Sequence, residues 1–291
     1  MDLENIRKID LHMHTKVSDG TDTPEEILEV VREKGLDLFA VSDHDAYLGC
    51  QRVEAVLTED SPHFLTGIEF SCKDEDGKYH ILGYGYDLNG ESLRAVVEKG
   101  HNFRISKTGK RLDFLKENFG FEFSKEDMEA LFALDNPGKP HIGNLMVQYG
   151  YAKDRNEAIH EYLNKAYFPS SYVRPEEAIE GILKSGGIPV LAHPSYGSGE
   201  ELILGEEMDA RLRKLMGFGL QGVEAYYSGF TKRLQAEMLS FAEKYHLYVT
   251  AGSDYHGKNK LVVLGDTNLE DVREGAEGLH AFLEAVSDRV I

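Results

Sequence analysis

Three short histidine-rich segments carry residue types that can bind metal ions. They have the sequence HMH at residues 12–14, SDHD at residues 42–45 and DYH at residues 254–256, and each directly follows an apolar run. Side chains two positions apart on an extended chain point to the same side, so His12 and His14 can reach into one space. Imidazole and carboxylate groups are ligands that suit Zn²⁺, Mn²⁺ or Fe²⁺. The spacing therefore predicts chelation of a divalent cation.

Further candidate ligands occur at the ends of other apolar runs. Any one of these side chains alone is more typical of a packed core or a solvated surface than of a metal site, and HxH by itself is a weak motif. Their joint placement favours a metal site, because six of the twelve histidines lie at such positions. The full candidate set is His12, His14, Asp19, His44, Glu69, His80, His193, Asp254 and His256.

The elements that must position these side chains follow an alternation of strands and helices. Strands are expected at Ile9 to Met13, Leu38 to Ser42, Phe64 to Phe70, Tyr79 to Gly85, Ile188 to Ala192, Gly222 to Tyr226 and Leu247 to Ala251. Such alternation predicts parallel strands joined by crossover helices. The candidate ligands would then meet at the strand ends, where the active sites of β/α barrels form.

The first predicted helix has recognisable start and stop residues. Thr23 is a suitable N-cap, Pro24 occupies the first helical position, and Glu26 completes a capping box. Gly35 is typical of a helix stop. The loop before this helix, residues 16–22, therefore carries Asp19.

Residues 91–174 show no strand alternation. Helical segments are expected near residues 92–118, 125–133, 141–149 and 155–163. A stretch this long cannot be a plain loop inside a compact domain, so we interpret it as a helical insertion domain. The barrel would then consist of residues 1–90 and 175–291, and the insertion would act as a lid over the barrel mouth.

The composition limits the classes of partner. A net charge of −19 argues against a broad surface for long nucleic acids, since binding a phosphate backbone requires clustered Lys and Arg. Small phosphate esters and short oligonucleotides remain compatible with this charge. Cys50 and Cys72 are too few for a disulfide framework and are expected to be half-buried thiols. The chain has neither a leader-like N-terminus nor a long apolar run, which predicts a cytoplasmic protein without membrane contact.

Taken together, the motifs resemble those of the PHP family, named for polymerase and histidinol phosphatase. The matching segments are HMHTKVSDG, SDHD, GIEFS, HILGYG, LAHP and GSDYHG, in family order from about residue 9 to residue 257. The resemblance implies an α/β fold, a distorted seven-stranded (β/α)7 TIM-like barrel, with two or three divalent ions (Mn²⁺, Zn²⁺ or Fe²⁺). It places the nine family ligands on the candidate set given above.

The resemblance also implies how the ligands divide among the ions. One ion would be held by His12, His14, Glu69 and Asp254, and a second by Glu69, His80 and His193. A third would be held by Asp19, His44 and His256, with Glu69 as the bridging ligand. Glu69, Asp254 and His256 are the residues expected to be essential for catalysis. Asp43 and Asp45 are expected either to orient imidazoles or to cap the following helix.

The insertion is similar to that of the family branch that contains nucleotide phosphatases and a 5′ to 3′ exoribonuclease. The similarity lies in Arg104-Ile105, Arg111-Leu112 and Lys139-Pro140-His141. Tyr226, Tyr227 and Ser228 follow an expected strand and should line the mouth, where an aromatic ring can stack on a base; ordinary rim packing is an equal alternative. The candidates for binding a second phosphate or the sugar are Arg104, Lys107, Arg111, Lys139, His141 and Ser228, although solvated helix faces also explain the basic ones.

The expected reaction is hydrolysis of small phosphate monoesters by metal-activated water. AMP and 3′,5′-bisphosphonucleotides are the expected substrates, and the water attacks phosphorus in line without a covalent intermediate. Histidinol phosphate, or exonucleolytic cleavage of short oligonucleotides, is the alternative. An amidohydrolase-type metallohydrolase fits the SDG and SDHD segments poorly, and a non-catalytic metal-binding module would be expected to lack ligands.

Overall fold

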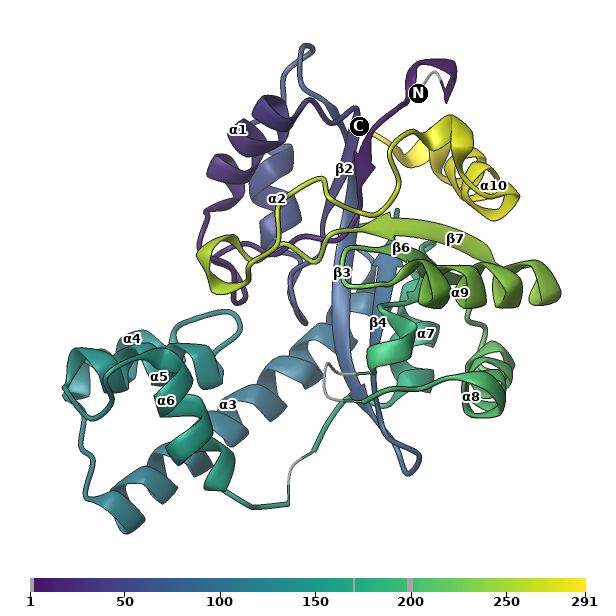
Figure 1. Cartoon of the computed structure of the whole chain (residues 1–291). Coiled ribbons are helices and arrows are strands. Elements are labelled where there is room, and N and C mark those ends of the chain that lie inside the picture. Colours follow the sequence, from purple (N-terminus) through teal and green to yellow (C-terminus); the bar gives the residue numbers. More distant parts are fainter. Residues whose placement is uncertain (1–2, 170, 198–200) are drawn as a thin grey trace. The chain divides into compact units, whose positions relative to one another are not determined.

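The computed structural model describes residues 3–169, 171–197 and 201–291, and a seven-stranded sheet forms its centre (Figure 1). The strands lie in chain order: β1 (Ile9–Asp10), β2 (Leu38–Val41), β3 (His63–Lys73), β4 (Lys78–Tyr84), β5 (Ile188–Leu191), β6 (Gly222–Tyr227) and β7 (Tyr248–Gly252). Beyond β1, the Leu11 N–H donates to Ala251 O at 2.9 Å. The first and last strands therefore meet, and the sheet is a nearly closed barrel, as predicted.

The sheet is mixed rather than all parallel, which corrects the prediction. The pairs β1–β2, β2–β3, β5–β6 and β6–β7 are parallel, but β4 is antiparallel to both β3 and β5. The reason is the short link between β3 and β4, in which the Asp74 N–H donates to Gly77 O at 3.0 Å. A hairpin of this length reverses the chain, whereas a parallel pair needs a long crossover.

Two strand boundaries also differ from the prediction, and both affect the site. β1 contains two residues only, so His12 and His14 lie beyond its end. β3 contains 11 residues, so Glu69 lies inside this strand and not at its end. The carboxylate of Glu69 consequently projects from a long, rigid element.

Six helices of the described chain pack on the barrel. They are α1 (Pro24–Lys34), α2 (Leu48–Glu54), α7 (Pro175–Lys184), α8 (Gly205–Gly217), α9 (Lys232–Tyr245) and α10 (Glu277–Val286). Four of them, α1, α2, α8 and α9, connect its parallel strands. The predicted capping box of α1 is present, because Thr23 Oγ1 accepts from the Glu26 N–H and Glu26 Oε2 accepts from the Thr23 N–H. Gly35, at φ +64°, ends this helix as predicted.

The chain divides into two compact units. The first contains residues 1–97 and 173–291, and the second contains residues 98–172. Helix α3 (Glu91–Phe119) runs from the first unit into the second, which also holds α4 (Lys125–Phe132), α5 (Lys139–Gln148) and α6 (Arg155–Glu157). The second unit has an apolar core of its own, to which Leu115, Ile142 and Met146 belong.

Two further predictions concern solvent and membrane. Cys50 and Cys72 are each 1% exposed, so both thiols are fully buried and not half-buried as expected. Cys72 and Cys50 belong to two separate apolar clusters of the interior. Among the described residues, no helix has the length and apolar character that crossing a bilayer requires.

Candidate metal centre

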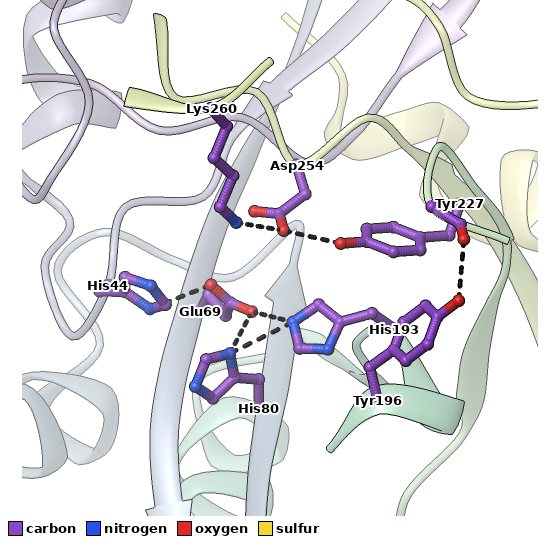
Figure 2. A pocket seen from close by; sticks show the side chains of 9 residues that line it. His44, Glu69, His80, His193, Tyr196, Tyr227, Asp254 and Lys260 are labelled. Carbon is purple, nitrogen blue, oxygen red and sulfur yellow. Dashed lines mark hydrogen bonds and ion pairs between the residues drawn. The ribbon is translucent and has the colours of Figure 1, made fainter. Parts of the chain in front are cut away.

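Glu69 lies at the centre of the histidine cluster. Its side chain is buried, and five imidazoles approach its two carboxylate oxygens at 2.9–3.4 Å. Figure 2 shows His44, His80 and His193 directed at this carboxylate from separate elements. The five imidazoles belong to His12, His14, His44, His80 and His193.

Asp254, just after β7, organises the neighbouring part of the cluster. Its Oδ1 atom lies 3.6 Å from His12 Nε2 and 3.4 Å from His14 Nε2. His256 Nε2 lies 3.2 Å from an oxygen of Asp19, which brings in the loop after β1. The structure therefore brings all nine predicted ligands together at one end of the barrel.

Eight of the nine predicted ligands, all except His193, form three overlapping groups, and within each group the ligand atoms lie within 4.8 Å of one another. These groups are His12, His14 and Asp254; His44, Glu69 and His80; and His14, Asp19, His44 and His256. The grouping resembles the expected three-ion division, but His14 and His44 each belong to two groups. The assignment of particular ligands to particular ions therefore stays a prediction.

The donor atoms fit divalent cations. His12 Nε2, His14 Nε2 and Glu69 Oε2 are buried, and within the described residues their contacts at 3.0–3.4 Å have ion-pair distances but not the geometry of hydrogen bonds. A buried polar atom left without a partner costs about 1–3 kcal/mol, so three of them in one cluster need an explanation. Cations bound between these atoms would satisfy all three. A set of nitrogen and oxygen donors without thiolate suits Zn²⁺, Mn²⁺ or Fe²⁺.

The charges within the cluster are mutually dependent. Burial alone would raise the pKa of Glu69, but His44, His80 and His12 outweigh burial and hold this pKa well below its usual range. Burial disfavours the charged form of His14, yet its contacts with Asp254 and Glu69 raise its pKa to about 9. The carboxylates consequently stay ionised, and protons and metal cations compete for the imidazoles.

Glu224 on β6 holds two of the candidate ligands and was missed by the sequence prediction. This carboxylate is fully buried, and its Oε1 atom lies 2.8 Å from His12 Nδ1. Its Oε2 atom accepts from the His193 N–H at 2.7 Å. A hydrogen bond at Nδ1 leaves the Nε2 lone pair of His12 to face Glu69. Only an isolated acidic residue in the apolar run GVEAYY could have indicated this role.

The close approach of Glu224 and His12 requires a glycine at position 252. A Cβ atom at Gly252 would lie 2.3 Å from Glu224 Oε1 and 2.3 Å from His12 Cβ. Both distances are far below van der Waals contact, so a side chain there would force the pair apart. Gly252 therefore permits the pairing across the barrel interior.

Asp43 anchors the loop that carries the first ligands. Its Oδ1 accepts from the Thr15 N–H at 2.8 Å and from Ser18 Oγ at 2.6 Å, while Oδ2 accepts from Thr15 Oγ1 at 2.7 Å. Ser18 Oγ also lies 3.4 Å from His14 Nδ1. Asp43 thus acts on His14 through the loop, which differs from the direct imidazole contact that was expected.

Asp45 has a similar supporting contact. Its Oδ1 accepts from the Ser71 N–H at 3.0 Å. The N-cap residue of α2 is Tyr47, which makes no side-chain cap hydrogen bond. The alternative expectation, that these aspartates cap the following helix, is therefore wrong.

Several non-glycine residues at the site have left-handed backbone conformations. The φ angles are +48° at Asp45, +26° at His193 and +59° at Asp254. Such conformations cost about 1–3 kcal/mol each and persist where neighbouring contacts hold them. The N–H of His193 is held by Glu224, and that of Asp254 donates to His12 O at 2.8 Å. The sharp turns after β5 and β7 direct these side chains into the cluster.

A cavity of about 430 Å³ opens beside the candidate ligands. Figure 2 shows its wall, with Lys260 and Tyr227 both directed at Asp254. Lys260 Nζ lies 2.6 Å from Asp254 Oδ2, and Tyr227 OH donates to the same oxygen at 3.0 Å. The described residues that line the cavity are His44, Glu69, His80, His193, Tyr196, Tyr227, Gly229, Asp254 and Lys260.

The three residues expected at the mouth, at the end of β6 and just after it, have different environments. Tyr227 lines the cavity, as expected. Tyr226 is 5% exposed and its hydroxyl accepts from the Ala276 N–H, so its placement at the mouth is wrong. Consecutive residues on a strand point to opposite faces, which explains the difference. Ser228 donates to Ser253 O at 2.7 Å, and its role in substrate binding stays a prediction.

The basic residues expected to bind substrate all lie in the helical unit. Lys107 Nζ lies 3.9 Å from the ring centre of Tyr172, and Lys139 Nζ donates to Asn164 Oδ1 at 2.6 Å. The Gly138 N–H donates to His141 Nδ1 at 3.2 Å, at the start of α5. A neutral His141 with this contact carries its proton on Nε2 and can donate from there.

Two guanidinium groups of this unit lie close enough to influence each other. Burial lowers the pKa of Arg111, and the positive charge of Arg104 lowers it further, against the opposing effect of Tyr172. Arg111 Cζ also lies 5.8 Å from the ring centre of Phe168. Neighbouring cations of this kind are typical of sites that bind anions.

Comparison with known proteins supports this chemistry. Residues 10–173 match the family model of the PHP domain. A phosphoribosyl 1,2-cyclic phosphate 1,2-diphosphodiesterase from Eggerthella lenta is 30% identical over 263 residues, which cover 86% of this chain and 94% of the relative. A 5′-3′ exoribonuclease from Haemophilus influenzae is 27% identical, and the match covers 86% of this chain and 90% of the relative. A 3′,5′-nucleoside bisphosphate phosphatase from Chromobacterium violaceum is also 27% identical, and the match covers 86% of this chain and 88% of the relative.

A solved structure shows the same fold. A crystal structure from Bifidobacterium adolescentis, described as a metal-dependent phosphoesterase, matches with a TM-score of 0.80 at 29% identity. The match covers 95% of this chain and 96% of that chain. The barrel with its helical unit is therefore shared over nearly the whole length.

A nearly closed barrel with a cluster of imidazoles and carboxylates at one end defines a metallohydrolase. The family match and the relatives narrow this class. The chain belongs to the PHP family, as the motifs predicted, and is a metal-dependent phosphoesterase, a hydrolase of phosphate esters.

Proposed function

We propose that this enzyme hydrolyses phosphate esters of small ribose compounds, with AMP and 3′,5′-bisphosphonucleotides as the primary candidates. The observation that carries the proposal is the convergence of five imidazoles on Glu69 at 2.9–3.4 Å. A carboxylate so surrounded is suited to bridging two cations. Divalent ions bound there would neutralise the charge of a phosphoryl group.

Two or three divalent ions, Mn²⁺, Zn²⁺ or Fe²⁺, would be held by the nine residues of the candidate set. Once bound, such ions neutralise phosphoryl oxygens and make water more acidic. The side chains have separate tasks. Glu69, Asp254 and Asp19 supply the negative charge that holds the cations, and the imidazoles fix their positions. We assign the catalytic roles to Glu69, Asp254 and His256, because Asp254 and His256 adjoin both the ligand cluster and each other, with His256 Nδ1 3.4 Å from Asp254 Oδ1.

The substrate class is supported by what the relatives share. A cyclic phosphoribosyl phosphate, an RNA end and a 3′,5′-nucleoside bisphosphate are all phosphorylated riboses with more than one phosphate ester bond or phosphate group. A substrate of that kind needs a binding group for its second phosphate. We propose that the helical unit supplies it through Arg104, Lys107, Arg111, Lys139 and His141, and that this unit acts as a lid.

Cleavage of short RNA from the 5′ end is the second candidate, supported by the exoribonuclease relative. The net charge of −19 disfavours long nucleic acids, because few cationic groups are available to replace the counterions of an extended backbone. Short oligonucleotides of a few residues would avoid this penalty.

The test is the turnover of a panel of substrates by the purified chain loaded with Mn²⁺, Zn²⁺ or Fe²⁺, followed both as release of inorganic phosphate and by chromatography of the nucleotide and sugar products. The panel contains AMP, adenosine 3′,5′-bisphosphate, a ribose cyclic phosphate, histidinol phosphate and a 5′-phosphorylated trinucleotide. We expect the nucleotides to be hydrolysed fastest. Activity on histidinol phosphate alone would refute the nucleotide proposal, and faster turnover of the trinucleotide would favour the exonuclease.

A further inference from the structure

Lys260 lies at the edge of the metal cluster in a position that neither the sequence motifs nor the metal ligands explain. It is the one lysine or arginine among the described residues that line the 430 Å³ cavity. Its side chain is 42% exposed, while its partner Asp254 is only 6% exposed. The ammonium group therefore reaches from the rim of the cavity into the interior.

Asp254 divides its two oxygens between different partners. Oδ1 faces the imidazoles of His12 and His14, at 3.6 and 3.4 Å. Oδ2 accepts from Lys260 Nζ at 2.6 Å and from Tyr227 OH at 3.0 Å. A cation bound at Oδ1 would thus leave the contact between Oδ2 and Lys260 in place.

The ammonium of Lys260 has donors to spare. A lysine has three N–H donors, and within the described residues Asp254 is the acceptor that contacts Nζ. The remaining donors can serve an acceptor in the cavity that Lys260 lines. A phosphate is such an acceptor, since it offers several charged oxygens.

The backbone before Lys260 is fixed to the loop of Asp19. The Lys258 N–H donates to Thr21 Oγ1 at 3.0 Å, and Asn259 Nδ2 donates to Asp19 O at 2.6 Å. These contacts hold the short turn that begins at Gly257, whose φ is +63°. Lys260 is therefore presented to the cavity by an anchored backbone and not by a free loop.

We propose that Lys260 is an anion-binding residue of the active site, which holds a non-bridging oxygen of the phosphate at the metal centre while it stays paired with Asp254. This inference rests on the proposed phosphoesterase reaction and adds a substrate contact from the barrel itself. The alternative role is that of a counter-ion for Asp254, without any contact to the substrate.

The two roles differ in their effect on phosphate binding. Removing the positive charge next to Asp254 strengthens cation binding in either case, because the carboxylate is then less neutralised. Only an anion-binding role also weakens phosphate binding. A hydrogen bond from a charged donor corresponds to a loss of about ten- to a hundredfold in affinity.

The test uses the metal-loaded full chain and the variants Lys260→Met, Lys260→Arg and Lys258→Met. Lys258 is the matched control, since it is an exposed lysine of the same segment outside the cavity lining. Inorganic phosphate is titrated calorimetrically, divalent cations are titrated against a competing chelator, and kcat/KM is measured with AMP. The calorimetric titration requires no turnover, so it separates this inference from the proposed function.

We expect Lys260→Met to bind phosphate about ten- to a hundredfold more weakly, and cations at least as tightly as the wild type. Lys260→Arg should recover part of the phosphate affinity, and Lys258→Met should match the wild type. Unchanged phosphate affinity in Lys260→Met would overturn the proposal, as would a parallel loss of phosphate and cation affinity or a wild type that binds no phosphate. Normal phosphate titrations without hydrolysis of any ester would instead contradict the proposed function.

Discussion

Replacing Glu224 with glutamine tests whether the metal centre depends on a residue that touches no metal. The substitution keeps the size of the side chain but removes its negative charge and one of its acceptors. In the wild type both carboxylate oxygens are used, one by His12 Nδ1 at 2.8 Å and one by the His193 N–H at 2.7 Å. A glutamine amide has its one acceptor oxygen at only one of these two positions and an NH₂ group at the other, so without rearrangement it cannot accept from both donors.

The size of the effect follows from these two contacts. Either His12 Nδ1 or the His193 N–H must lose its acceptor and face the NH₂ group of the glutamine. Water cannot replace the lost acceptor, because Glu224 and His12 are both 0% exposed. Loss of one buried charge-assisted hydrogen bond costs roughly 1.5–3 kcal/mol. If most of this cost falls on the orientation of His12 or His193, metal affinity drops about ten- to a hundredfold, which is the range for residues that orient metal ligands.

The assay is competitive titration of Mn²⁺ or Zn²⁺ against a chelator of known affinity. Thermal unfolding of the metal-free protein is recorded in parallel. Glu243→Gln is the control, because Glu243 is an exposed residue of α9 and this change removes the same charge from the surface. We expect Glu224→Gln, but not Glu243→Gln, to bind metal weakly. The kcat of Glu224→Gln should be near normal once saturating metal restores occupancy of the site.

Two results would refute this reasoning. The first is a folded Glu224→Gln variant that binds metal as tightly as the wild type. The second is a variant whose Tm falls in the metal-free state while its metal affinity is unchanged, since that pattern describes a purely structural residue.

The remaining predictions concern the ligands, the metals and the thiols. Glu69→Gln, which removes the charge that five imidazoles surround, should lower kcat by orders of magnitude with AMP while circular dichroism stays native; near-normal turnover would exclude Glu69 as bridging ligand. Metal at about 100 times its Kd should stabilise the fold by about 2.7 kcal/mol and raise the Tm by about 5–10 °C, and a Tm that does not respond to chelator would contradict a metal site. Burial raises the pKa of Cys50 to about 12 and that of Cys72 also upward, so iodoacetamide should label neither thiol before unfolding; rapid labelling of the native chain would show that the interior opens.

The fold and most of the cluster were predictable because their patterns are local. His12 and His14 share a face through their spacing, and barrel strands bring their ends together without further information. The same reasoning placed His193 and Asp254 after strands that lie far apart in the sequence. Family motifs then supplied the order of the segments, and the family match confirms that resemblance.

The direction of β4 was missed although the sequence contains a hairpin pattern. Residues 73–78, KDEDGK, include an Asp-Gly pair between two apolar runs, which favours a tight turn over a crossover helix. The regular alternation elsewhere outweighed this local pattern. A length criterion would have corrected it, because the eight residues between the two expected strands, 71–78, are too few for a crossover connection.

Glu224 and Lys260 could not be found in this way, because their roles depend on contacts across the barrel. Glu224 is 212 residues from His12 in sequence, and no spacing rule connects the two. Lys260 follows the last motif by three residues, but nothing in GSDYHGKNK says that its side chain turns back onto Asp254. Partners of a site are defined by tertiary packing, whereas ligands are often defined by local spacing.

Glu224 and Lys260 both help an acidic protein to bind an anionic substrate. A protein of net charge −19 attracts cations and repels anions, so a phosphate ester can approach only where the local charge is reversed. The carboxylates among the candidate ligands, Asp19, Glu69 and Asp254, carry three negative charges, and two divalent ions would leave the cluster only slightly positive. Lys260 adds to that small excess on the side where the cavity opens, and Glu224 keeps the imidazoles oriented so that the ions stay. Phosphate binding should therefore require prior metal loading, and a metal-free chain that binds phosphate with wild-type affinity would contradict this order.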